Sequence, residues 1–358
     1  MLRKSRLVAA LLITTAGFVP VLAHAALFIT IVQGLSGQPQ YEKEFGDARQ
    51  KIETASHSIT DNDKVFSFAG DKATRAALLK HFADLGKKMG ANDRAAIYLI
   101  GHGSFDGDTY KFNIPGPDLT GEDLKGVLEH LPGSNHVLVS TGSASGAMVE
   151  TITGTANIRS RGKADASGAP REAEAASAAK APSKYLLISG TRNGNERNAT
   201  QFARFFADAL SSKDADVNKN NSISVQEAFD YADKRVSGYF QEEGKLATEH
   251  AQLRGDGAAQ LNLSRLNAAE QKAELANASG KLQELLKRRQ QLDAEIEDLQ
   301  VKRGQMSNAD YVAKFQQLVL QSAELNEQID AAQKQDKGLK PAVPAPVAPP
   351  IPESKSVP

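Results

Sequence analysis

Short continuous apolar runs, each ending near glycine or a small polar residue, recur through the first two thirds of the chain. Runs of this kind are typical of strands that are buried on both faces of a sheet. Stretches with helical spacing of apolar residues separate them, which predicts an α/β fold: a parallel-rich sheet with right-handed crossovers and helices on both faces. The expected strands are residues 27–32, 65–68, 95–100, 136–140 and 184–189, and the expected helices are residues 41–55, 73–89, 120–131 and 200–210, with another beginning at 148.

Side chains capable of chemistry follow two of these expected strands. His102 and Gly103 come just after residues 95–100, and Ser143 lies in the small-residue stretch after residues 136–140. Parallel sheets bind ligands beyond the carboxyl ends of their strands, so we expect the imidazole and the hydroxyl to meet there. The backbone amides of Gly103 and Ser143 would then form an oxyanion hole.

The two motifs, in this order, resemble the caspase-like fold of cysteine peptidases, especially the legumain branch. That family carries its catalytic His before Gly after one strand, and its catalytic Cys before a small residue, Ser and Gly after the next. Matching the Ser-Gly step places Ser143 at the position of the cysteine, whereas matching the strand places Gly142 there. The resemblance covers residues 27–253 and implies a three-layer caspase-like sandwich.

The resemblance also implies a substrate pocket. In the legumain-like family the pocket is lined partly from the strand end and from the position two before the nucleophile, which correspond here to Ser189 and Thr141. Thr141 stands where legumain has an acidic residue. A preference for asparagine is therefore not implied for this chain.

The chain contains no cysteine, which excludes the thiol mechanism of that family. A serine hydroxyl needs a base that is itself oriented by a third group. Three functions remain open: an inactive homologue, or pseudoenzyme, that binds a peptide or protein in the former substrate groove; a hydrolase that uses Ser143 with His102; and a calcium-stabilised scaffold. We favour the first.

The N-terminus has the pattern of a secretory signal peptide. Basic residues at 3–6 precede an apolar run at 7–22 and the small-residue step Ala23-His24-Ala25, which predicts a signal peptide over residues 1–25 and export to the periplasm or the extracellular space. No later run is long and apolar enough to predict an integral membrane segment. Equal counts of 43 basic and 43 acidic residues argue against a nucleic-acid partner.

Residues 216–227 match an EF-hand calcium loop position by position. Asn221 replaces the usual glycine at the sharp turn, and Asn tolerates the left-handed conformation that this turn needs. With two carboxylates, the loop is expected to bind calcium weakly, with a dissociation constant of about 10⁻⁴–10⁻³ M. A polar turn without an ion is the alternative. The expected ligands are Asp216, Asn218, Asn220, Ser222, Ser224 and Glu227.

Composition divides the chain into further segments. Residues 26–263 form the expected α/β domain, within which residues 153–183 have too few apolar side chains to order themselves and are expected to be a disordered loop. Heptad spacing of apolar residues over 264–334 predicts a coiled-coil helical hairpin. It packs on itself in the interpretation that we prefer, and against another copy or a partner in the alternative. Residues 335–358 form a proline-rich tail that cannot fold alone.

Overall fold

The computed structural model describes residues 25–133, 135–154, 184–278 and 280–339. The expected signal peptide, disordered loop and proline-rich tail fall largely outside these ranges, so they stay predictions. Within the part of the chain that is described, no helix is long and apolar enough to cross a membrane.

The centre of the molecule is a six-stranded sheet with the order β10-β8-β7-β3-β1-β2. Neighbouring strands from β8 to β2 pair in parallel, and β10 closes one edge as an antiparallel strand. Every residue of β1, β3 and β7 is buried, because their apolar side chains face helices on both sides of the sheet. The strands are β1 (Leu27–Gln33), β2 (Val65–Phe68), β3 (Arg94–Ile100), β7 (His136–Ser140), β8 (Tyr185–Ser189) and β10 (Gln252–Arg254).

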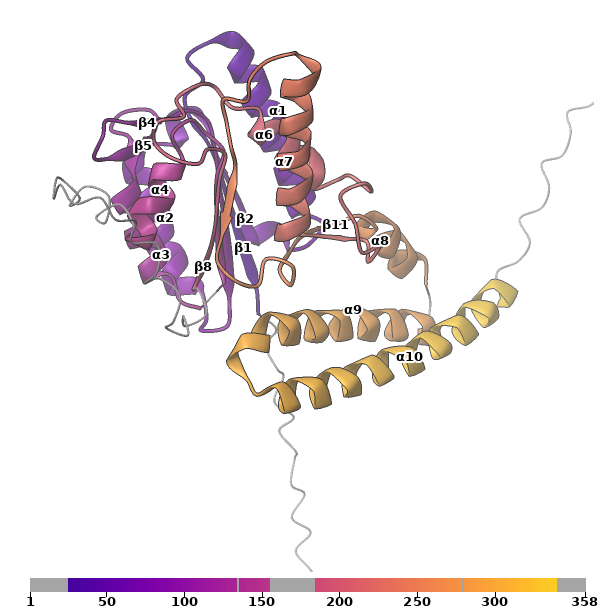
Figure 1. Cartoon of the computed structure of the whole chain (residues 1–358). Helices are drawn as coiled ribbons and strands as arrows, with labels where there is room; N and C mark the ends of the chain where they lie inside the picture. Colours follow the sequence, from indigo (N-terminus) through magenta and orange to yellow (C-terminus); the bar gives the residue numbers. More distant parts are fainter. Residues whose placement is uncertain (1–24, 134, 155–183, 279, 340–358) are drawn as a thin grey trace, which may run out of the picture.

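Helices cover both faces of this sheet and give the domain three layers (Figure 1). One face carries the first core, in which Ile31, Tyr98 and Phe206 are fully buried. The other face carries the second core, around Ile97 and Leu138. The expected α/β sandwich with a parallel-rich sheet is confirmed. The helices of the first face are α1 (Pro39–Ser56), α6 (Phe202–Ala209) and α7 (Val225–Glu242), and those of the second are α2 (Arg75–Lys88), α3 (Gly121–His130) and α4 (Gly146–Thr153).

The described structure also contains two small sheets and three short 3₁₀ helices, and the hydrophobic pattern predicts none of them. The first small sheet is β4 (Gly103–Phe105), β5 (Tyr110–Phe112) and β6 (Leu119–Thr120), and it begins directly after His102. The second pairs β9 (Ser222–Ser224) with β11 (Asn262–Arg265). The 3₁₀ helices are η1 (Asn62–Lys64), η2 (Gly70–Lys72) and η3 (Lys302–Gln305).

Three helices at the C-terminal end form what we call the arm: α8 (Ala268–Asn277), α9 (Gly280–Val301) and α10 (Asn308–Leu339). α9 and α10 run side by side in opposite directions, with α9 nearer to the sheet (Figure 1). Leu282, Leu292, Leu325 and Ile329 are buried in a core that belongs to the arm alone. α10 continues past the expected boundary at residue 334.

Candidate functional site

The two loops expected to form the site lie in direct contact at the carboxyl ends of β3 and β7, which are adjacent strands. A β-carbon added to Gly142 would lie 2.4 Å from the carbonyl oxygen of Gly101. One added to Gly103 would lie 2.5 Å from the carbonyl oxygen of Ser143. Only glycine allows the loops to approach this closely, because any side chain at either position would push them apart.

Ser143 lies inside this contact, with 4% of its surface exposed. Its Oγ donates a hydrogen bond of 2.8 Å to the backbone carbonyl of Asn198. The next residue, Ala144, has a φ of 57° and donates its amide to the carbonyl of Glu196 at 2.7 Å. The segment around residues 196–198 therefore covers the serine.

His102 is half-buried on the α1 side of its loop. Its ring packs edge-on against Tyr41 and Phe45, with ring centroids 4.7 and 5.0 Å away. Burial lowers the pKa of His102, because the apolar surroundings disfavour the imidazolium. A hydrogen bond with the backbone of Ser36 opposes this shift. Among the described residues, no hydrogen bond joins His102 to Ser143; their loops meet, but their side chains have different partners.

The two residues expected to line the pocket, Thr141 and Ser189, are 1% and 0% exposed. The Thr141 hydroxyl donates to the carbonyl of Leu99 at 3.1 Å, and the Ser189 hydroxyl donates to the carbonyl of Thr191 at 2.8 Å. Ser140 shares a hydrogen bond of 2.8 Å with Tyr110. These hydroxyls form a buried polar layer whose groups satisfy one another and the main chain.

The turn that follows Ser143 also has polar groups that are already hydrogen-bonded. Gly146, at the start of α4, donates its amide to the Thr191 hydroxyl at 3.0 Å, and Thr191 is fully buried. Ser145, also fully buried, shares a hydrogen bond of 3.3 Å with the same hydroxyl. An oxyanion at this turn would have to displace those bonds.

Glu249 is a buried carboxylate next to the site that the sequence reasoning missed. It is 3% exposed and accepts hydrogen bonds from the amides of Gln201 and Phe202, at 2.7 and 3.2 Å, at the start of α6. Burial raises the pKa of Glu249 to about 7, and these two bonds oppose the shift. The signal available in the sequence was weak: α6 begins without a capping side chain of its own.

Glu196 extends this acidic group toward the surface. Its carboxylate lies 2.7 Å from Nδ1 of His250 and accepts the backbone amides of Arg192 and His250. The same residue supplies the carbonyl that binds Ala144. The stretch before β10 is therefore tied to the turn that holds Ser143.

The expected calcium loop has the turn geometry that such a site needs. Asn221 has a φ of 61°, the left-handed conformation expected of it. Asp216 accepts the amides of Asn220 and Asn221, and Asn218 accepts the amide of Asn220, so these side chains are folded into the loop. The oxygen donors suit calcium by type.

Glu227, the last expected ligand, already has four hydrogen-bond donors. Oε1 accepts the amides of Val217 and Asn218, and Oε2 accepts the amide and the hydroxyl of Ser224 in a capping box that starts α7. An ion would share these oxygens with the protein. The described residues contain no group of three or more His, Cys, Asp or Glu side chains that could hold a metal. This loop itself has only two carboxylates, and its other expected ligands are Asn and Ser oxygens.

Comparison with known proteins gives no family assignment: no family model and no curated protein matches the chain. Among solved structures, caspase-1 from Spodoptera frugiperda is similar to this chain with a TM-score of 0.37 and 10% sequence identity. The match covers 64% of this chain and 87% of that chain. The α/β fold follows from the strand order and the helical layers of this chain and not from this match.

Proposed function

We propose that the chain is an exported, catalytically inactive homologue of caspase-like and legumain-type peptidases that binds a peptide or protein partner. The main support for the proposal is that the Ser143 hydroxyl is buried and donates its hydrogen bond to a backbone carbonyl. The positions of His102 and Ser143 after adjacent parallel strands support the family resemblance. The pattern of residues 1–25 supports export.

Inactivity follows from what a serine nucleophile requires. Its hydroxyl proton must pass to a base within about 2.6–3.2 Å, and the base must be oriented by a third group. Here the proton of Ser143 is directed at Asn198, and the His102 ring is held between Tyr41 and Phe45. Both side chains would have to leave these positions before they could react together.

The partner surface that we propose lies on the α1 side of the same sheet edge. Leu35 follows β1 and is 47% exposed, and Tyr41 and His102 are partly exposed beside the segment that contains Ser36. Tyrosine is enriched among the residues that anchor protein partners, and Leu35 adds apolar surface beside it. We infer that an apolar side chain of the partner packs against Leu35 and Tyr41.

Calcium is the second part of the proposal. The support is the order of oxygen donors over residues 216–227 together with the folded-in side chains of Asp216, Asn218 and Asn220. Bound there, the ion would hold the segment after α6 against the start of α7. Its role would be structural, since the loop lies apart from the turn that holds Ser143.

Two experiments test the main proposal. A fluorophosphonate probe, which labels activated serines, should leave the purified chain unlabelled; labelling that disappears in Ser143→Ala would establish the hydrolase instead. For binding, peptides selected from a displayed library against the chain should lose affinity for Leu35→Asp. The matched control is Leu246→Asp, because Leu246 is 90% exposed and lies far along the chain from α1. Equal loss in both variants would reject the surface.

A further inference from the structure

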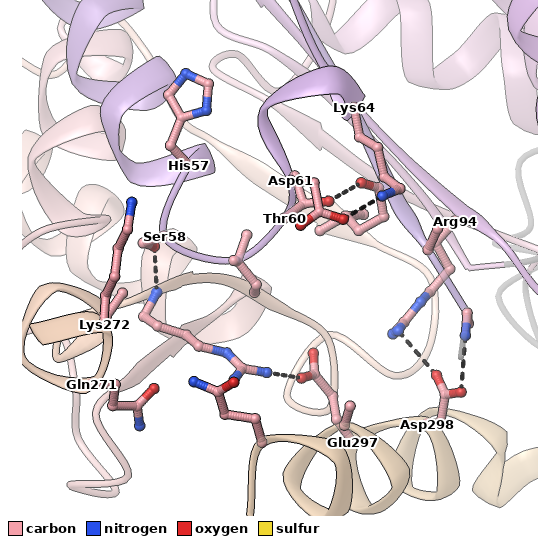
Figure 2. A pocket seen from close by; sticks show the side chains of 18 of the residues that line it. His57, Ser58, Thr60, Asp61, Lys64, Arg94, Gln271, Lys272, Glu297 and Asp298 are labelled. Carbon is pink, nitrogen blue, oxygen red and sulfur yellow. Dashed lines mark hydrogen bonds and ion pairs between the residues drawn. The ribbon is translucent and has the colours of Figure 1, made fainter. Parts of the chain in front are cut away.

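A polar cavity of about 560 Å³ lies between the arm and the α/β domain, at the amino ends of β1 and β3 (Figure 2). His102 and Ser143 follow the carboxyl ends of β3 and β7. The cavity lies at the amino ends of the parallel strands, so it is separate from the candidate site. One wall comes from the domain: residues 26–27, the segment 57–64 after α1, Arg94 and Arg265, together with Ala25, the last residue of the expected signal peptide. The other wall comes from α8 and α9.

All three carboxylates that line the cavity are in ion pairs. Arg94 pairs with Asp298 at 3.2 Å, and Arg265 pairs with Glu297 at 3.0 Å, so that each pair joins the domain to α9. The third acid, Asp61, pairs with Lys64 within the domain wall (Figure 2). The carboxylates of the lining therefore leave no negative charge free to neutralise a further cation.

Cationic and hydrogen-bond donor groups remain in excess after these pairs are formed. Lys272, on α8, lines the cavity and pairs with no acid among the described residues. The imidazole of His57 lies on the same side of the view as Lys272 (Figure 2). The Nε atoms of Arg94 and Arg265 are buried and have no hydrogen-bond partner in the described structure. Buried donors without a partner are uncommon in proteins. Because both Nε atoms are enclosed, Lys272 and the parts of the two arginine side chains that line the cavity are the donors that a ligand reaches first.

We propose that this cavity binds a small organic anion carrying phosphate or carboxylate groups, and that the bound anion fastens the arm to the domain. The volume lies within the range of about 300–1,000 Å³ that is usual for small-molecule sites. Phosphate and carboxylate oxygens accept charge-assisted hydrogen bonds from lysine and arginine, which are the donors in excess here. Because Lys272 stands on the arm and Arg94 on the domain, an anion that reaches both holds the two parts together.

Calorimetric titration of the full chain with inorganic pyrophosphate and, separately, with citrate tests the proposal. Ionic strength is held constant, because screening alone changes weak electrostatic binding. At least one probe should bind saturably, and which one binds distinguishes a phosphate ligand from a carboxylate ligand. Lys272→Gln should weaken that binding about tenfold, the usual effect of losing one charge-assisted hydrogen bond.

The matched control is Lys287→Gln. Lys287 is also an exposed lysine of the arm, but it does not line the cavity, so its removal should leave the affinity unchanged. Neither lysine is buried, and both variants should fold as the parent does. Hydrogen exchange provides a second readout: the bound probe should slow exchange in α8 and α9 of the parent.

Two results would overturn the proposal. One is the absence of saturable binding by both probes. The other is the same affinity in Lys272→Gln and Lys287→Gln, which would show that any binding is made elsewhere on the arm. Neither result bears on Ser143, so this inference and the proposed function stand or fall separately.

Discussion

Several hydroxyl groups near the carboxyl ends of β7 and β8 are buried, but their hydrogen bonds do not arrange them for reaction. Ser140, Ser143 and Ser189 are each buried, and each hydroxyl has a partner within hydrogen-bond distance. An unpaired buried hydroxyl costs roughly 1–3 kcal/mol in proteins, so such groups are paired wherever the fold allows it. At this edge the pairing partners are backbone carbonyls and Tyr110, which cannot act as bases.

Glu249 is a buried carboxyl whose charge state we expect to affect stability. Its pKa is raised to about 7 from an ordinary value of 4.5 because the carboxyl is buried. Between these two pH values the folded chain holds a proton on Glu249 that the unfolded chain releases, so the contribution of Glu249 to the free energy of unfolding falls as pH rises. The shift corresponds to a loss of up to about 3 kcal/mol across this window. Urea unfolding measured at several pH values from 4.5 to 8 checks this.

The control for this prediction uses two substitutions. Glu249→Gln removes the titrating group, so between pH 4.5 and 7 its stability should fall less, or rise more, with pH than that of the parent. Glu242→Gln removes an exposed carboxyl at the end of α7 and should leave the pH dependence as it is in the parent. The slope of the parent alone does not decide the question, because burial lowers the pKa values of His81 and His136 to about 4 and these groups make stability rise with pH over part of the same window. An unchanged pH dependence in Glu249→Gln would contradict the raised pKa.

At the scale of elements, the sequence predicts the large strands and helices because their apolar patterns are long. β1, β3 and β7 are continuous apolar runs, and α3 begins at the Thr120 cap as expected, with Asp123 completing a capping box. β4, β5 and β6 are two or three residues long, too short for any periodicity to show. These strands pair because the chain after His102 folds back on itself. That fold-back depends on tertiary packing, which the local hydrophobic pattern does not predict.

The loop between α6 and α7 carries the calcium prediction. If calcium binds the folded chain with a dissociation constant of about 10⁻⁴–10⁻³ M, a concentration of 10 mM should stabilise it by about 1–3 kcal/mol. The measurement is thermal or urea unfolding with calcium and with a chelator. Asp216→Asn, which keeps the shape of the side chain and removes its charge, should abolish the difference.

Asp214→Asn serves as the matched control for that loop. Asp214 is exposed and lies two positions before the first expected ligand, so its charge is near the loop but outside the ligand pattern. The calcium effect should persist in this variant. Identical stability of the parent chain with calcium and with chelator would instead leave residues 216–227 as a polar turn that binds no ion.

At the scale of the whole molecule, the sequence predicts that the loops after β3 and β7 meet at the carboxyl ends of these strands, but it does not show what covers them. The loops of His102 and Ser143 meet because the carboxyl ends of adjacent parallel strands lie together, which strand order alone predicts. Asn198, which accepts the Ser143 hydroxyl, and Glu249, which caps α6, come from distant segments without a recognisable motif. Their positions follow from packing of the complete chain.

The arm and the domain have separate apolar cores, joined by a polar contact. The arm core contains residues of α9 and α10 with Leu275 and Ala278, whereas Leu261 and Leu263 belong to the first core of the domain. The links between the two parts include the ion pairs of Arg94 with Asp298 and of Arg265 with Glu297. Both pairs are largely buried, so the cost of removing their charges from water offsets much of their attraction, and they stabilise the contact far less than an apolar core would.

A chain that ends after Asn267 should therefore fold on its own. It keeps β11 and both cores of the sheet, and removal of α9 lets water reach Arg94, so that its charge is not left buried without a partner. We expect a single cooperative unfolding transition in urea and a free energy of unfolding within about 2 kcal/mol of that of the full chain. Asp298→Ala in the full chain tests the reasoning from the other side: Arg94, which is 7% exposed, loses its partner, so the arm should separate from the domain more easily, and the loss of stability should not exceed that caused by removal of the whole arm. If the shortened chain shows no cooperative transition, the arm is part of the fold, and the boundary between the two cores does not mark the boundary of the folding unit.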